Sequence, residues 1–271
     1  MKNFSKLLLF TALAGMFFGS SGKKVLDNDQ DTGLVPLFIK FDNIAGSRDL
    51  VLNTGNYANA SGESLSISQL QYFISNIKLR RTDGKEYATN QDDGYFLIQE
   101  SVPATHMVKL KVPEGDYNQL TFVLGVDSLR NTMNISKRTG VLDPASSMDN
   151  GMYWSWNSGY IFFKMEGESP AAPADPIGNR KFRYHIGGFG GYSAPTINNI
   201  KTISLDLTQS GIAKARKNKK PTISVSADIL KVFNATTTVS IATHSSVMFS
   251  EYSVNIANNY SKMFAHLRTE N

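Results

Sequence analysis

Short runs in which apolar and polar residues alternate recur along most of this chain, and this period-two pattern constrains its fold more than any other feature. The run at 34–43 (LVPLFIKFDN) places Leu37, Ile39 and Phe41 at alternate positions. Such alternation is typical of β-strands with one face on a core, because successive strand side chains point to opposite faces. Similar runs occupy 73–79, 95–100, 107–112, 120–124, 181–192, 200–207 and 222–233.

Turn signals separate several of these runs. Asp83-Gly84 and the segment PEGDY (113–117) each lie between two strand-like runs, as hairpin turns do. The strands do not alternate with long helical segments, and no internal repeat is visible. The pattern therefore predicts an all-β protein, an antiparallel β-sandwich with a few short helices.

Helical patterns are short and few. Residues 65–81 are expected to begin as a helical turn and to end as a strand, and 249–267 are expected to be helical. The apolar face of this second helix has the helical spacing i, i+4, i+7 and i+8 and consists of Ile256, Tyr260, Met263 and Phe264. The proline-rich segment 169–179 is expected to be a loop, so one domain spans about 34–268.

The N-terminus has the pattern of an export signal. Lys2 and Lys6 precede an apolar stretch at 7–18 and small residues near position 21. This predicts a signal peptide over 1–21, lipoprotein-like but without the cysteine that would carry a lipid, and a polar linker over 22–33. We expect a protein secreted across the inner membrane, periplasmic or on the cell surface of a Gram-negative bacterium. Membrane attachment would need lipidation, which this sequence does not support.

The composition excludes several kinds of site. The chain has no cysteine among its 271 residues, which excludes disulfides, cysteine-ligated zinc and thiol nucleophiles. The net charge is +5, and the basic run at 213–220 alone contains five positive residues and no acidic one. This run is expected to be a solvated loop. No aromatic platform accompanies that run, so nucleic acid is not an expected partner.

Both tryptophans lie in one aromatic stretch, GMYWSWNSGYIFFKMEG (151–167). Strand alternation would direct Trp154 and Trp156 to the same face, and NSG (157–159) could turn the chain. Each ring could bury roughly 200 Å2, so a place in the core is energetically sufficient. A chemical role for one of the rings stays open.

Histidine is the remaining metal ligand to consider. The four histidines, none at metal-ligand spacing from another, are His106, His185, His244 and His266. His185 lies in a strand that ends in glycines, whereas His266 is expected near the C-terminal end of a helix. No phosphate-binding loop and no G-x-S-x-G elbow is present, so the chain is expected not to be an enzyme.

The order of several segments resembles the MbnP family, secreted proteins of copper handling that are associated with di-haem peroxidases. The segments GMYWSWNSGY (151–160) and HIGG (185–188) carry the most specific part of this resemblance. The other matching segments are FDNIAG (41–46), YFISNIKL (72–79), PEGDYNQLTFVLGVD (113–127) and NNYSKMF (258–264).

The resemblance implies a secreted all-β domain in which copper(I) is bound by two imidazoles and a tryptophan that a partner di-haem cytochrome c peroxidase-like protein has oxidised to kynurenine. By resemblance, His185 is the first candidate ligand, and His106 and His244 are candidates for the second. Trp154 or Trp156 is the candidate for oxidation. In the family's copper binders a histidine follows the modified tryptophan by two residues, whereas here Trp156 and Ser158 stand at those positions.

Three functions follow from these observations. The first is a secreted, non-catalytic metal-binding protein for copper uptake or presentation. The alternative is a surface-associated binding or scaffold domain that has lost the copper site. A third, supported only by the many aromatic residues, is a hydrolase or a carbohydrate-binding protein.

Overall fold

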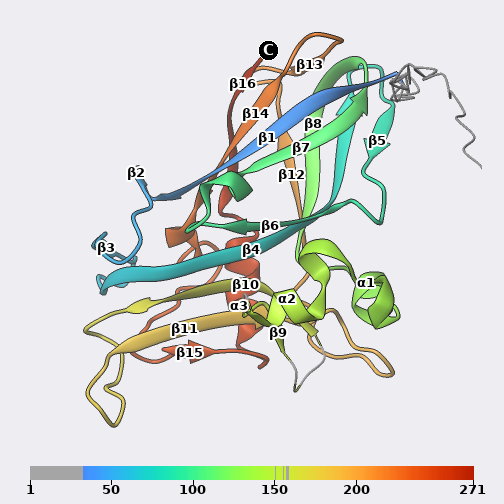
Figure 1. Ribbon diagram of the computed structural model, residues 1–271. Helices are drawn as coiled ribbons and strands as arrows, with labels where there is room; N and C mark the ends of the chain where they lie inside the picture. The colour runs from blue at the N-terminus through green and yellow to red at the C-terminus, as the bar shows by residue number, and fades with distance from the viewer. Residues whose placement is uncertain (1–32, 150, 155, 157–158) are drawn as a thin grey trace, which may run out of the picture. The chain divides into compact units, whose positions relative to one another are not determined.

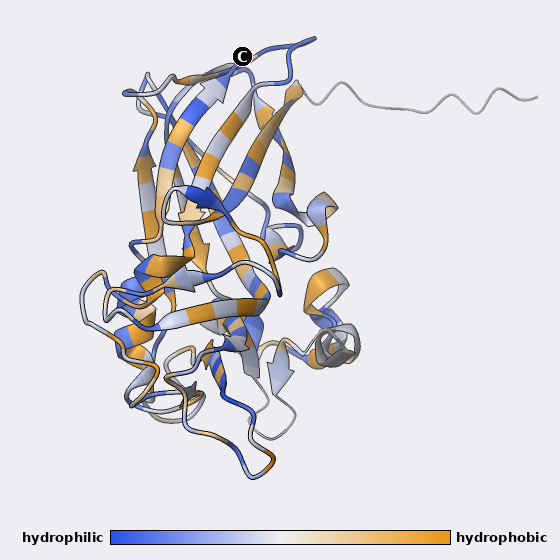
Figure 2. Cartoon of the chain, turned by 90° about the vertical axis from the view of Figure 1, so that its left-hand side faces the viewer, coloured by the Kyte–Doolittle hydropathy of each residue, from blue (hydrophilic) through white to orange (hydrophobic). Residues whose placement is uncertain are grey.

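The first strand of the structure follows the alternation closely. A computed structural model describes residues 33–149, 151–154, 156 and 159–271 (Figure 1). In β1 (Leu34–Ala45) every second residue is buried, Leu37, Ile39 and Phe41 among them. Figure 2 shows hydrophilic and hydrophobic residues alternating along the other long strands as well.

The described strands form two sheets, one of five strands and one of eleven. The five-stranded sheet contains β1, β2 (Arg48–Asp49), β7 (Met107–Pro113), β14 (Thr222–Asp228) and β16 (Phe264–Glu270). The larger sheet contains β3 (Tyr57–Ala58), β4 (Ser64–Arg81), β5 (Glu86–Ala88), β6 (Tyr95–Gln99), β8 (Gly115–Leu124), β9 (Tyr153–Trp154), β10 (Gly159–Glu168), β11 (Lys181–Gly187), β12 (Lys201–Asp206), β13 (Ala213–Ala215) and β15 (Ser246–Val247).

The expected all-β fold is confirmed, with one difference in strand direction. Most pairings are antiparallel, but β1 pairs with β14 in parallel, and β11 pairs with β15 in parallel. The main path through the larger sheet runs β12-β8-β4-β10-β11-β15. The sheets are therefore mixed, and the edge next to β11 is formed by a short strand from the C-terminal part of the chain.

An aromatic cluster holds the two sheets together. Phe41 from β1 packs edge-on against Phe122 from β8, with ring centroids 5.6 Å apart. Phe264 from β16 packs against the same Phe122 at 5.0 Å and against Tyr72 from β4 at 5.8 Å. All four rings are buried, so the core lies between the inner faces of the sheets.

The helices are short. They are α1 (Ser128–Thr132), α2 (Pro144–Asp149) and α3 (Ser253–Tyr260), with single 3-10 turns η1 (Pro103–His106), η2 (Ile135–Lys137), η3 (Gly140–Leu142) and η4 (Ile229–Val232). None of the helices in the described ranges has the length and apolar character needed to span a bilayer.

The helix expected over 249–267 is only partly correct. The segment forms α3 and then, after a turn, the strand β16, which carries His266. Phe264 has the spacing of the helix face but packs in the aromatic cluster between the sheets. Tertiary packing has overridden the local helical pattern here, and His266 is not near a helix terminus.

Two further boundaries differ from expectation. Residues 64–81 form the single long strand β4, without the helical turn expected at its start. The strand expected over 222–233 ends at Asp228, where the side chain of Asp228 accepts a hydrogen bond from the N–H of Leu230 and begins η4.

Some expectations lie outside the described residues. They are the signal peptide at 1–21, the linker as far as residue 32, and positions 157 and 158 of the expected turn. Within the described part, the contacts group Gly33–Asn271 into one compact unit.

Candidate functional site

A row of polar side chains crosses the outer face of the larger sheet. The pairing register places Gln99 of β6, Gln71 of β4, Lys164 of β10 and His185 of β11 side by side. Their chain neighbours Tyr72, Met165 and Tyr184 are buried and point to the opposite face, toward the core. His185 therefore lies on the face of the sheet that is turned away from the core.

His185 is held by the carboxylate of Glu166, which follows Lys164 by two residues in β10. Its Nε2 lies 2.7 Å from Oε1 of Glu166, and the Nζ of Lys164 lies 3.5 Å from the same oxygen. The hydrogen bond from His185, together with the charge of Lys164, lowers the pKa of Glu166 to about 2. An ionised carboxylate only accepts hydrogen bonds, so Nε2 of His185 carries the hydrogen.

Trp154 lies over the same strand, β11. A Cβ added to Gly187 would lie 2.7 Å from the Trp154 ring and 2.4 Å from the carbonyl oxygen of Tyr160. Gly187 follows His185 by two residues and so shares its outer face, about 6.6 Å further along the strand. The absence of a side chain at Gly187 lets the indole approach the backbone, on the face that also carries His185.

The two tryptophans have different surroundings. Trp154 is 6% exposed, whereas Trp156 is 65% exposed, and their ring centroids are 5.4 Å apart. The place in the core that the sequence allows for both rings is therefore taken by Trp154 and not by Trp156. Trp154 also contacts Phe249 edge-on at 6.3 Å, and a cavity of about 170 Å3 beside it is lined by Phe189, Tyr192 and Phe249.

His106 lies far from His185. Its Nε2 is 3.0 Å from the backbone oxygen of Gln99, on the side of β6 away from β4, and 3.6 Å from Oε2 of Glu100. Three strand spacings of about 4.8 Å separate Gln99 from His185, which makes about 14 Å. Burial raises the pKa of Glu100. His106 belongs to this separate polar cluster.

His244 is also separate from His185. Its ring stacks on that of Tyr252, with centroids 3.5 Å apart. It precedes Ser246, which pairs with Arg183, so the register displaces it along the sheet from His185. Within the described ranges, no three His, Asp or Glu side chains are grouped so that they could hold a metal ion. The structure thus does not bring the three candidate ligands together.

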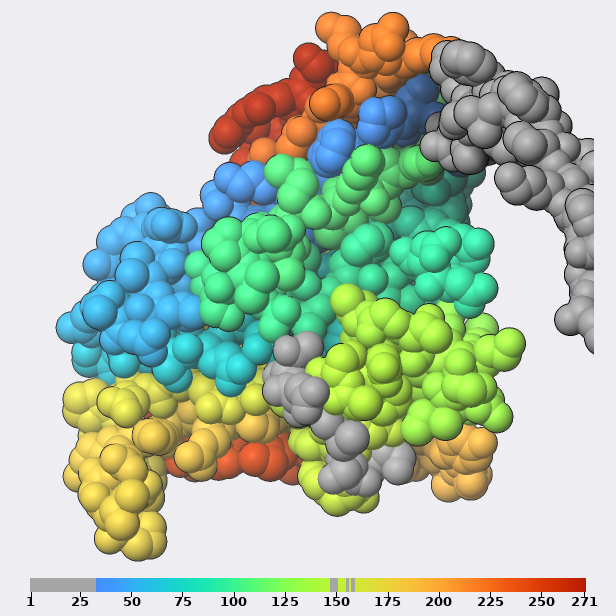
Figure 3. Space-filling model, viewed as in Figure 1, coloured from blue at the N-terminus to red at the C-terminus, as the bar shows by residue number. Residues whose placement is uncertain are grey.

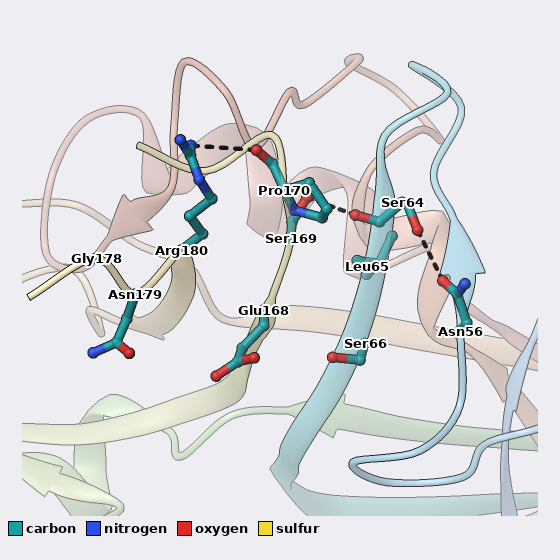
Figure 4. Close-up of a pocket in the computed structure, with 10 residues that line it drawn as sticks. All are labelled: Asn56, Ser64, Leu65, Ser66, Glu168, Ser169, Pro170, Gly178, Asn179 and Arg180. Atoms are coloured by element: carbon teal, nitrogen blue, oxygen red, sulfur yellow. Dashed lines mark hydrogen bonds between the residues drawn. The ribbon is translucent and has the colours of Figure 1, made fainter. Parts of the chain in front are cut away.

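A larger cavity lies elsewhere, next to the projecting connection from β10 to β11 (Figure 3). Its volume is about 510 Å3, and Figure 4 shows its polar lining. Ser169 donates a hydrogen bond to the backbone oxygen of Ser64 at 2.6 Å, and Arg180 donates to that of Ala172 at 2.6 Å. No histidine and neither tryptophan lines it, so it is distinct from the face around His185.

Comparison with known proteins identifies the relatives of this chain. The MbnP family model matches residues 35–249. This chain belongs to the MbnP family. MbnP from Methylosinus trichosporium has a similar structure, with a TM-score of 0.55 and 19% sequence identity over 80% of this chain and 82% of that one. Comparison with curated protein sequences found no significant match.

The expected MbnP copper site has two imidazoles and a modified tryptophan, and the described residues fit it only in part. All four histidines lie in the described ranges, and His185 is the one on the face with Trp154. His266 lies in the smaller sheet, with its Nε2 2.9 Å from Oγ1 of Thr269. His185 lies two residues along β11 from Gly187, which the Trp154 ring approaches, and the other three histidines have partners elsewhere.

Reasoning from the sequence missed Lys164 and Glu166. The signal was present in FFKMEG (162–167), where two charged residues are spaced by two inside an apolar strand. That spacing puts them on one face of β10. Their pairing with His185 depends on the register between β10 and β11, which no local pattern reveals.

Proposed function

We propose that this protein is a secreted, non-catalytic member of the MbnP family that binds copper for uptake or presentation at the face formed by His185 and Trp154. The observation that carries the proposal is the imidazole of His185, held through Nε2 by Glu166 on the strand face that Trp154 covers. A hydrogen bond from one ring nitrogen to a carboxylate is the usual way to orient a metal-binding histidine through its other nitrogen. Imidazole suits copper.

A copper(I) titration against a competing chelator tests this proposal. We expect the purified protein to retain copper(I), and we expect His185→Ala to reduce the affinity by roughly tenfold or more. His106→Ala is the matched control, because His106 lies in a different polar cluster. Equal retention by the wild type and His185→Ala would contradict the proposed site.

The state of the tryptophans provides a second test. A di-haem cytochrome c peroxidase-like partner would oxidise Trp154 or Trp156 to kynurenine, which opens the indole ring and turns its nitrogen into an aniline nitrogen beside a ketone. A mass spectrum of the peptide with both residues, from native cells, should show the corresponding mass gain. The N-terminal sequence of the same material should begin near residue 22 if the export signal is removed.

One observation favours the alternative function, a surface-associated binding or scaffold domain without copper. It is the single imidazole on the face that Trp154 covers. This alternative predicts unmodified tryptophans and no retention of copper(I) by the wild type. The titration and the mass spectrum together distinguish the two functions.

A further inference from the structure

A groove apart from the face of His185 lies on the larger sheet, over the strands β4, β5, β8 and β12. β10 separates these strands from β11, the strand that carries His185. The volume of the groove is about 440 Å3, a size that accommodates a small organic molecule. A ligand in this groove would therefore not contact the proposed copper face.

Short side chains on four neighbouring strands form the floor of the groove. The pairing register places Lys78 of β4 between Ala88 of β5 and Thr121 of β8. In the next row along β8, Val123 lies opposite Thr202 of β12. The residues next to these in β4, β8 and β12 are buried, so the floor is on the face turned away from the core. Apart from the lysine, no long side chain rises from this floor.

Lys78 supplies the positive charge of the groove. It is the one cationic residue among the described residues of the lining, and its side chain is exposed. Its Nζ makes no hydrogen bond or ion pair with any other described residue. An ammonium group without a partner, at one side of a small groove, favours a ligand with a carboxylate, because charge-assisted hydrogen bonds are the strong ones.

The other part of the groove is apolar. Val123 follows Thr121 by two residues in β8, which places it about 6.6 Å along the strand from the row of Lys78. Leu129 of α1 lines the same groove and is 58% exposed. Because a ligand that covered Val123 and Leu129 would remove apolar surface from water, the groove favours a ligand with an apolar body.

Asp127, the acidic residue of the lining, has no acceptor site left for a ligand. Its Oδ2 accepts hydrogen bonds from Asn76 at 2.8 Å, from Gln91 at 3.2 Å and from the hydroxyl of Tyr95. Its Oδ1 accepts one from the N–H of Arg130 at 3.0 Å. A carboxylate has about four acceptor sites, and these bonds fill them. The groove therefore favours an acid over a ligand that also carries an ammonium group.

We propose that this groove binds a small amphiphilic carboxylate, with its carboxylate at Nζ of Lys78 and its apolar body over Val123 and Leu129. A medium-chain fatty acid has this chemistry. The inference goes beyond the proposed function and does not depend on it, because the groove shares no residue with the face of His185.

Calorimetric titration with octanoate and with uncharged octanol tests the role of Lys78. We expect the wild type to bind octanoate roughly tenfold or more tightly than octanol, because only octanoate makes a charge-assisted bond. Lys78→Met keeps an apolar stem without the charge and should bind both probes alike. Lys109→Met, at an exposed lysine of β7 in the other sheet, should bind octanoate as the wild type does.

A substitution in the floor tests the place of binding. Thr202→Trp puts a large ring at an exposed position of the floor and should abolish the binding of octanoate. Thr208→Trp is the matched control, because Thr208 is exposed just beyond β12 and outside the groove, and it should bind as the wild type does. Circular dichroism should confirm that both variants are folded.

The outcomes decide the inference without reference to copper. It is overturned if the wild type shows no saturable binding of octanoate, or if Lys78→Met or Thr202→Trp binds octanoate as the wild type does. Tighter binding of octylamine than of octanoate would also overturn it, because the groove would then select a cation. A failed copper(I) titration would contradict the proposed function and leave this inference unchanged.

Discussion

At the scale of single residues, Trp154 and Trp156 are separated by one residue, yet they contribute differently to the stability of the fold. Trp154 contacts Phe249 and lies against the backbone at Gly187, whereas Trp156 is largely exposed. The strand β9 ends at Trp154, so the alternation that would have put both rings on one face does not extend to Trp156. We therefore expect Trp154, and not Trp156, to contribute to the free energy of unfolding.

Substitution of the two rings tests this difference. Trp154→Ala should lower the free energy of unfolding by about 3–5 kcal/mol, because it removes a buried ring and leaves a cavity. Trp156→Ala should change it by about 0.5 kcal/mol or less, as surface substitutions do. Urea unfolding followed by circular dichroism measures both, and equal losses would contradict the assignment of Trp154 alone to the core.

Glu166 makes stability depend on pH. Its pKa is about 2 in the folded protein against an ordinary value of 4.5, so the folded state favours its ionised form. This contribution is present above about pH 4.5 and is lost as the pH falls toward about 2. The loss should be at most on the order of 3 kcal/mol, reduced by solvent screening.

Acid unfolding of a variant pair checks this pH dependence. Glu166→Gln should unfold with a shallower dependence on pH between about 4.5 and 2 than the wild type does. Glu168→Gln, an exposed position on the same strand, should follow the wild type. Identical acid profiles for Glu166→Gln and the wild type would show that the carboxylate is not held by His185 and Lys164.

At the scale of elements, the long strand β4 organises the larger sheet. It pairs with β10 along its first half and with β8 along its second, and β3, β5 and β6 pair with it as well. Its register shifts against both partners, and Asn76 within it has a φ of 50°. These irregularities bend a strand of 18 residues so that it can belong to a curved sheet.

Gly167 tests one of these irregularities. It lies at the bulge between β10 and β4, where an added Cβ would be 2.0 Å from the backbone oxygen of Ser66 and 2.7 Å from the Phe182 ring. Gly167→Ala should cost about 3 kcal/mol or more, because neither neighbour has room to move. Gly178→Ala meets no atom within 4 Å and adds only backbone strain, about 1 kcal/mol. Similar losses in thermal unfolding would contradict the close approach.

At the scale of the whole described unit, the aromatic cluster around Phe41 couples the two sheets. Neither sheet can separate without exposing Phe41, Tyr72, Phe122 and Phe264 to water, which costs about 25 cal/mol for each Å2 of apolar surface. The buried hydroxyl of Tyr72 in the larger sheet also donates to Asn43 of β1 at 2.7 Å. The sheets should therefore unfold together.

Unfolding measured by two probes tests this coupling. Tryptophan fluorescence reports on the larger sheet through Trp154 of β9, with Trp156 in the turn after it, whereas far-ultraviolet circular dichroism reports on all strands. The two transitions should coincide. Phe41→Ala should shift both together by about 3–5 kcal/mol. A fluorescence transition that stays in place while the dichroism transition moves would show that the sheets are independent.

Local sequence patterns were sufficient for part of this structure. The alternation in β1 and the hairpin turn at Asp83-Gly84 are local features, and the all-β fold follows from many of them. The helix expected over 249–267 failed at Phe264 because contacts with Phe41 and Phe122, distant in sequence, decided its state. A local periodic pattern carries no information about contacts between residues far apart in the sequence.

The sequence by itself determined the fold class and the family resemblance, and it singled out His185 as a candidate ligand. Only the tertiary structure decided its surroundings: Glu166 through the β10–β11 register, and Trp154 near the same strand through the bare backbone at Gly187. The physical reason is that strand pairing is a contact between segments far apart in the chain. A one-residue change of register would turn His185 from the outer face to the core.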